Sequence, residues 1–219
     1  MQRNNLDESK LSRMTRVIGS VAANFTPNQN WTFSTNFSNF NSSTEMMLIT
    51  SFDTLRYAQV SKNAGLMVMY NKVQNDNRIT VTGAGNYQIA KINGVTNTEF
   101  YNANLTAQYG LTKIKTNLSL SVSYNQNISE FFVTEAFGPT LGVSKSAFKN
   151  KLMMTLSSSV LQSYSNGNNV GFIYNNRFSA KYKLTKSHQF SANVTFAKRE
   201  DPSKAYSELI ATIGYNYTF

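Results

Sequence analysis

Almost the whole chain alternates apolar and polar residues with a period of two, and this pattern leaves few folds open. In segment 117–124, Leu118, Leu120, Val122 and Tyr124 are separated only by serines. Such alternation is typical of β-strands with one apolar and one polar face, whereas a helix repeats its apolar residues every three or four positions. About eleven segments show it and none has a helical period. The sequence therefore predicts an all-β fold, with strands around residues 17–25, 31–37, 60–70, 79–89, 101–109, 117–124, 141–147, 152–164, 172–182, 190–196 and 206–219.

The last eight residues of the sequence add a more specific signal. Thr212, Gly214, Tyr217 and Phe219 place a polar residue, a glycine two positions on, and aromatics at the third-last and last positions. In a soluble protein a bare apolar edge strand invites aggregation. The pattern resembles the C-terminal strand of bacterial outer-membrane β-barrel proteins, and the resemblance implies that these four residues are an assembly signal read by the barrel-assembly machinery. An ordinary amphipathic strand is the alternative.

The composition fits a membrane barrel without requiring one. Mean hydropathy is slightly negative, and no stretch approaches the roughly 20 apolar residues of a spanning helix. Strands of membrane barrels alternate lipid-facing and lumen-facing residues, so they average out as polar. The chain is rich in aromatics, with 15 Phe, 12 Tyr and 1 Trp, and has no cysteine. Disulfides and thiolate metal sites are thereby excluded.

Connection lengths set the expected topology: an antiparallel up-and-down transmembrane β-barrel of about 10–12 visible strands. Long connections are expected at 41–59 and 126–139, and short ones at 26–30, 110–115 and 148–151, as for outer loops and periplasmic turns. The short connection at 165–169 does not fit this alternation. Residues 13–219 are thus expected to form the strands, with short periplasmic turns and longer outer loops.

Residues 1–12 are expected to be an external loop or a truncated start. The sequence begins without a basic segment followed by an apolar one, the mark of an export signal. Counting about eleven strands back from a periplasmic C-terminus also places the start outside the cell, whereas bacterial single-chain barrels have even strand numbers. We therefore expect the 219 residues to be the C-terminal part of a larger barrel. A strand count wrong by one is the alternative.

The whole chain has a net charge of +10, and its basic residues concentrate at the predicted short turns. A basic periplasmic rim next to anionic lipid headgroups is the simple interpretation, and a docking ring for a periplasmic protein is the alternative. Lysines scattered over separate hairpin tips, without stacking aromatics, argue against nucleic-acid binding. The rim comprises Lys113, Lys115, Lys149, Lys151, Lys183 and Lys186.

Candidate catalytic groups are few. The single histidine, His188, has no second histidine with which to bind a metal, and we interpret it as a solvated turn residue. We predict no catalytic, metal or cofactor-binding residues, no cofactor and no enzyme activity. Arg177 is the notable charge predicted inside the barrel. It could favour anions or hold an inward-folded loop through Glu208, or it could have no specific role.

The resemblance to outer-membrane barrels implies a location in the bacterial outer membrane, contact with membrane lipid and lipopolysaccharide, and possible periplasmic or outer-membrane protein partners. The Asn/Lys/Thr-rich strands and tyrosine-rich strand ends resemble those of Bacteroidota. Two functions stay open: a polar-lined pore or transport barrel, and a structural scaffold subunit of an envelope complex. Conductance in planar bilayers, or stable co-purifying partners with a blocked lumen, would separate them.

Overall fold

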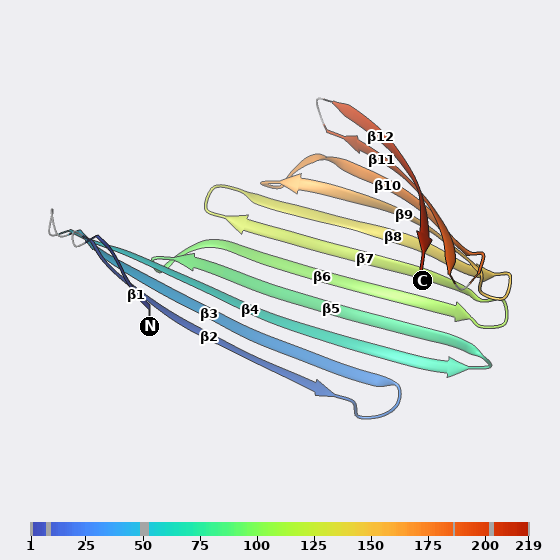
Figure 1. Cartoon of the computed structure of the whole chain (residues 1–219), viewed down its shortest axis with the longest axis horizontal. Coiled ribbons are helices and arrows are strands. Elements are labelled where there is room, and N and C mark those ends of the chain that lie inside the picture. The colour runs from blue at the N-terminus through green and yellow to red at the C-terminus, as the bar shows by residue number, and fades with distance from the viewer. Residues whose placement is uncertain (1, 8–9, 49–52, 186, 202–203, 219) are drawn as a thin grey trace.

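The computed structural model describes residues 2–7, 10–48, 53–185, 187–201 and 204–218, and within them the chain forms one antiparallel sheet (Figure 1). Its twelve strands lie in sequence order, each hydrogen-bonded to the next. This confirms the predicted all-β, up-and-down architecture. The strands are β1 (Gln2–Asp7), β2 (Lys10–Phe25), β3 (Trp31–Leu48), β4 (Asp53–Gln74), β5 (Asn77–Ile92), β6 (Val95–Leu111), β7 (Thr116–Ser129), β8 (Val133–Ala147), β9 (Leu152–Ser165), β10 (Asn168–Lys183), β11 (His188–Glu200) and β12 (Ala205–Tyr217).

Most strands are longer than the sequence predicts. β4 has 22 residues and β3 has 18, whereas about 9–11 residues suffice for a tilted strand to cross a membrane. The long loops predicted at 41–59 and 126–139 are wrong, because β3 and β4 fill most of the first segment and only 130–132 separate β7 from β8. The polar residues there continue the ladder, whose hydrogen bonds satisfy the backbone. Polarity marks the end of the apolar band and not the end of the strand.

Three connections are two-residue turns with both residues in the left-handed region. They are Asn75–Asp76, Asn93–Gly94 and Asn166–Gly167, with φ values of 50° and 64°, 51° and 81°, and 49° and 78°. Turns of this kind match the right-handed twist of the strands they join, and asparagine and glycine tolerate positive φ. The unexpectedly short connection at 165–169 is therefore a tight hairpin.

Residues Gln2–Asp7 and the first part of β2 form a short hairpin, where an external loop is predicted. Gln2 pairs with Met14 and Asp7 with Lys10. The described strands number twelve, within the predicted 10–12, and the interpretation of residues 1–12 as an external loop or a truncated start stays a prediction. The position of this hairpin outside the cell also stays a prediction.

The sheet is strongly curved and open (Figure 1), and β12 pairs with no strand except β11 in the part of the chain that the structure describes. We call the end of the sheet with connections 26–30, 75–76, 112–115, 148–151 and 184–187 the inner rim, and the opposite end the outer end, after the predicted orientation. No hydrophobic side chain within the described ranges is buried. The same residues contain no helix that is long and apolar enough to cross a membrane.

Candidate functional site

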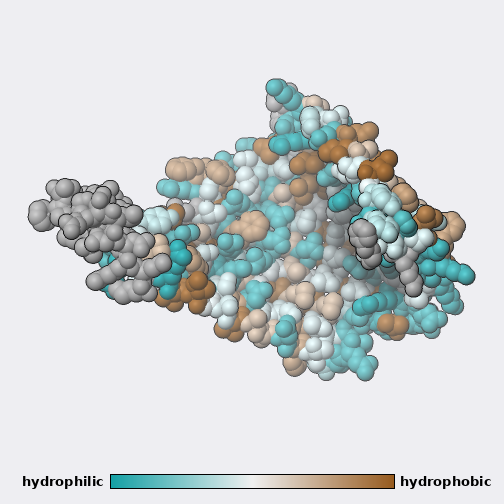
Figure 2. Space-filling model, in the orientation of Figure 1, coloured by the Kyte–Doolittle hydropathy of each residue, from teal (hydrophilic) through white to brown (hydrophobic). Residues whose placement is uncertain are grey.

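The pairing register separates the side chains into an apolar convex face and a polar concave face. Leu120 pairs with Ala107 and Leu141, whereas Ser121 pairs with Thr106 and Thr140. Paired residues point to the same face and successive residues to opposite faces. The prediction that Leu120 and Ser121 lie on opposite faces is thus confirmed. Viewed into its hollow, the sheet is predominantly hydrophilic at its centre (Figure 2).

The convex face carries exposed apolar side chains with aromatics near both strand ends. Leu105 and Ile213 are 57% and 89% exposed to solvent, which a water-soluble surface would not tolerate over a wide area. Near the inner rim the rings of Trp31 and Tyr70 lie 4.8 Å apart between centroids. Near the outer end Tyr101 donates a 2.8 Å hydrogen bond to Glu99. Aromatics with a wet hydroxyl at both ends of an apolar band are typical of membrane barrels.

The interpretation of His188 as a solvated turn residue is wrong. It begins β11, is half-buried, and lies on the convex face beside the terminal strand. Its Nδ1 and the hydroxyl oxygen of Tyr215 are 2.6 Å apart, and its ring lies 4.9 Å from that of Tyr217 between centroids. The histidine therefore belongs to the aromatic cluster at the inner rim and connects β11 to β12.

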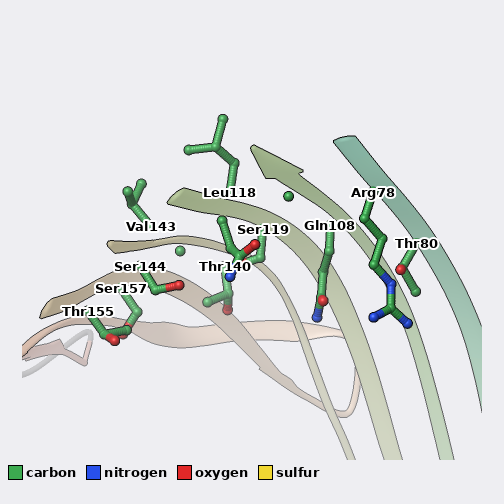
Figure 3. A pocket seen from close by; sticks show the side chains of 13 residues that line it. Arg78, Thr80, Gln108, Leu118, Ser119, Thr140, Val143, Ser144, Thr155 and Ser157 are labelled. Atoms are coloured by element: carbon green, nitrogen blue, oxygen red, sulfur yellow. The ribbon is translucent and has the colours of Figure 1, made fainter. Parts of the chain in front are cut away.

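The concave face holds a hollow with a volume of about 490 Å³ (Figure 3). Figure 3 shows its polar side chains on one side of the sheet, whereas Leu118 and Val143 point to the other. We call the polar lining the belt. It crosses five strands, from β5 to β9, and consists of Arg78, Thr80, Gln108, Asn117, Ser119, Thr140, Ser144, Thr155 and Ser157, with Gly110 and Gly142 between them.

Two adjacent rows of cross-strand pairs build most of the belt. In one row Arg78 pairs with Gly110, Gly110 with Asn117, Asn117 with Ser144, and Ser144 with Thr155. This row starts at Arg78, the second residue of β5, and reaches Thr155, the fourth residue of β9, because the strands are staggered. The belt therefore rises obliquely along the wall.

The parallel row runs through Thr80, Gln108, Ser119, Gly142 and Ser157, again by direct pairing. Two glycines deepen the hollow between the polar side chains. A Cβ atom added at Gly142 would lie 2.3 Å from Oγ of Ser119, and one at Gly110 would lie 2.9 Å from Oδ1 of Asn117. Larger residues at these positions would displace belt side chains and fill the hollow.

A side-chain hydrogen bond orients Arg78 at the β5 end of the belt. Its Nε donates a 2.9 Å hydrogen bond to Oδ1 of Asn71, and Oγ1 of Thr80 donates a 3.1 Å bond to the same oxygen. Figure 3 shows the guanidinium projecting from β5 into the hollow. A guanidinium with a fixed orientation presents its remaining N–H donors as a fork, the geometry that carboxylates and phosphates match.

Arg177 lies one strand beyond the belt, on β10. It pairs with Ser157 and with Thr195, on the concave face, as the sequence predicts for a charge inside the barrel. Its side chain is exposed. It forms no ion pair with Glu208 among the residues that the structure describes, although Glu208 also lies on the concave face by its pairing with Ala197. Its role stays a prediction.

Charge is divided between the faces in a way that the sequence analysis did not predict. By register, acidic Glu45, Glu99, Glu135 and Glu200 lie on the convex face near the outer end. Among the side chains that the structure describes in β2 to β12, Glu208 is the one acidic group on the concave face, by its pairing with Ala197. The basic side chains on that face are Arg16, Arg78, Arg177, Lys181, Lys183 and Arg199. The inside of the sheet is therefore positively charged.

The predicted basic rim lies at hairpin ends along one edge of the sheet. Lys113 and Lys115 lie in the β6–β7 connection, and Lys115 Nζ donates a 2.9 Å hydrogen bond to Oδ1 of Asn150 in the β8–β9 connection. Lys149, Lys151 and Lys183 line a second hollow of about 620 Å³ between neighbouring turns. Lys186 falls outside the described residues. What binds at this rim stays a prediction.

The residues of the predicted assembly signal lie on β12 in alternation. Thr212 and Gly214 pair with Asn193 and Ser191 on the concave face, whereas Tyr217 pairs with His188 on the convex face. Phe219 falls outside the described residues. Recognition of this strand by the assembly machinery stays a prediction.

Comparison with known proteins defines the fold. No protein-family model matches the sequence, and neither does any curated protein. Among solved structures, the copper transporter OprC superposes with a TM-score of 0.65 at 12% identity, over 95% of this chain and 41% of OprC. The outer-membrane protein OmpT of Vibrio cholerae superposes with a TM-score of 0.50 at 8% identity, over 96% of this chain and 98% of OmpT.

The chain has the fold of a bacterial outer-membrane β-barrel protein. At these identities the likeness establishes the fold alone, and the location that goes with this fold is the outer membrane. The apolar convex face and its aromatic ends agree with that location. The chain spans less than half the length of OprC. A Bacteroidota origin stays a prediction.

Sequence reasoning missed the belt and the role of Arg78 within it. Arg78 is the second residue of β5, close to the turn at Asn75–Asp76, and its own strand gives no sign of a ligand-binding role. Cross-strand pairing, which the alternation within one strand cannot reveal, brings Arg78 into line with Asn117 and Ser144. A search for polar residues that would pair with one another across several consecutive hairpins, and so lie on the same face, could have found the belt.

Proposed function

We propose that the chain forms the wall of a polar-lined pore or transport barrel in the bacterial outer membrane. The belt is the observation that carries this proposal. Hydroxyl and amide side chains from five adjacent strands line the concave face over a hollow of about 490 Å³. A barrel filled by its own core would direct apolar side chains inward. A wall of hydrogen-bonding side chains instead suits water and polar solutes.

Conductance tests the pore directly. Full-length protein purified from outer membranes and inserted into planar bilayers should give discrete, reproducible current steps in potassium chloride. A properly folded, heat-modifiable barrel that gives no current and releases no trapped solute from liposomes would contradict the pore. The absence of enzyme activity stays a prediction.

We also propose that the sheet is an arc of a larger barrel, of which this chain is the C-terminal part. The direction of the strands supports this. β2 and β12 both run from the outer end to the inner rim, so direct pairing between them would be parallel in an otherwise antiparallel sheet. β1 has the opposite direction but only six residues, and it covers β2 only as far as Met14. Further strands would complete an antiparallel barrel.

The comparison with OprC also supports a larger barrel. The arc superposes better on a part of that larger chain, with a TM-score of 0.65, than on nearly the whole of OmpT, with a TM-score of 0.50. A match to part of a longer chain agrees with an arc of a larger barrel. During biogenesis we expect the barrel-assembly machinery to read β12, and in the membrane we expect contact with lipid and lipopolysaccharide.

A scaffold subunit is the second candidate, favoured by the hollow between the basic turns. Lys149, Lys151 and Lys183 there could bind an acidic periplasmic protein, although anionic headgroups would suit the same charges. Replacing the three lysines with glutamine should release a co-purifying partner if the rim is a docking ring. Unchanged co-purification, or the absence of any stable partner, would favour the headgroups.

A further inference from the structure

We propose that the belt binds an acidic oligosaccharide, with Arg78 and Arg177 contacting its anionic groups. The proposal names a substrate class for the barrel and rests on the proposed transport function. It is carried by three properties of the concave face: the chemistry of the belt, the positions of the two arginines, and the distance between them.

The lining of the belt matches a polyhydroxylated ligand. Serine and threonine hydroxyls donate and accept hydrogen bonds, and the amides of Gln108 and Asn117 do both through separate atoms. A sugar hydroxyl also donates and accepts, so each ring could exchange water contacts for wall contacts without loss. An apolar solute would gain little at such a surface, because the polar side chains would lose their water.

The charge of the wall selects an anion. Arg78 lies at the β5 end of the belt. Arg177, on β10, lies just beyond the opposite end, next to Ser157. No belt residue is acidic. Asn71 already fixes the orientation of the Arg78 side chain, so little side-chain freedom would be lost when the guanidinium meets a carboxylate or sulfate.

The separation of the two arginines favours an oligomer over a single sugar. Arg78 is on β5 and Arg177 on β10, five strand spacings apart, or about 24 Å along the curved wall at 4.7–4.9 Å per spacing. No monosaccharide spans that distance. A short acidic chain lying along the oblique rows could contact both guanidinium groups and the hydroxyls between them.

Binding should be measured by titration calorimetry on the full-length protein in detergent, with mannuronic acid hexamer as probe and maltohexaose as neutral control. We expect the acidic hexamer to bind at least about tenfold more tightly, since a charge-assisted hydrogen bond is stronger than a neutral one. Arg78→Gln with Arg177→Gln should reduce that preference to less than about threefold. Replacement of both by lysine should restore part of it, because lysine keeps the charge but loses the fork.

Lys72→Gln is the matched control, since Lys72 lies close to Arg78 at the inner rim but on the convex face, where it pairs with Ile79. It should leave both affinities unchanged. Gly142→Thr tests the hollow itself, and should weaken both hexamers by filling the space near Ser119. Chloride-over-potassium selectivity in bilayers should also fall in the double glutamine variant but not in Lys72→Gln.

The outcomes separate this inference from the pore. Equal affinity for the two hexamers, or a preference that survives removal of both arginines, would overturn the acidic oligosaccharide. Conductance without binding of either hexamer would overturn the belt as a sugar site while leaving the pore in place. Arginine-dependent binding by a barrel that does not conduct would support the belt and contradict the pore.

Discussion

At the scale of single residues, the face of the sheet on which a residue lies determines which substitutions it tolerates. Leu120 is 48% exposed on the convex face, although leucine is a core residue in soluble proteins. Ser121, its neighbour, pairs with two threonines on the concave face. An introduced charge should therefore destabilise the protein far more at Leu120 than at Ser121.

Arginine at Leu120 and arginine at Ser121 should consequently differ in stability. At the bilayer midplane, arginine on the lipid face of a barrel costs roughly 2–4 kcal/mol, whereas a wet lumen keeps it hydrated. We expect Leu120→Arg to lower the free energy of unfolding in lipid vesicles by about that amount, and Ser121→Arg to change it by less than about 1 kcal/mol. Urea titration of the folded, heat-modifiable fraction would measure both. Greater damage from Ser121→Arg would mean that Leu120 does not face lipid.

At the scale of elements, the hairpins explain how a chain of such low apolar content keeps its register. The Asn166–Gly167 turn joins β9 to β10, and Asn166 also ties β8, because its Oδ1 accepts a 2.8 Å hydrogen bond from the Val133 backbone. Gly167 has a φ of 78°, in the region that costs other residues about 1–2 kcal/mol. The turn therefore fixes which residues of the two strands face each other.

Gly167→Val should accordingly destabilise the sheet by at least about 1–2 kcal/mol, since a β-branched residue strongly disfavours positive φ. Gly19→Val provides the control, because Gly19 lies within β2 without a positive φ and a Cβ there would meet nothing within 4 Å. Urea titration in vesicles would compare the two. If both variants lost equal stability, the turn conformation would not be what matters.

The elements also show how far the sequence could predict the structure. Alternation within a strand identified Leu118 to Tyr124 and its opposite face, because period two is a local property. It could not locate the ends of β3 and β4, since polar residues such as Thr44 and Glu45 still pair with Tyr57 and Arg56. Nor could it reveal the belt or the separation of acids from bases, which depend on register across several hairpins.

At the scale of the whole molecule, the open edges of the sheet have to be covered in the membrane. Backbone groups of a strand edge cannot remain without partners in hydrocarbon, so a spanning sheet must close. Within the described residues, no strand pairs with the edge of β12 that faces away from β11. After Met14, no described strand pairs with the edge of β2 that faces away from β3. Their parallel directions argue that they do not meet each other.

A pair of cysteines tests this closure in the full-length protein. Ala23 on β2 and Ile213 on β12 both lie on the convex face toward the inner rim, so they would be close if the two edges met. We expect Ala23→Cys with Ile213→Cys to form no disulfide under mild oxidation in native membranes. Ala23→Cys with Thr35→Cys should form one readily, since these residues face each other on β2 and β3, where paired Cβ atoms lie about 4.5–5.5 Å apart.

Electron cryomicroscopy of the same protein gives the complementary measurement. A barrel with more strands than the twelve described here, with further strands lying between β2 and β12, would agree with an absent disulfide. A disulfide between the β2 and β12 positions, or a closed barrel of these strands alone, would contradict the larger barrel.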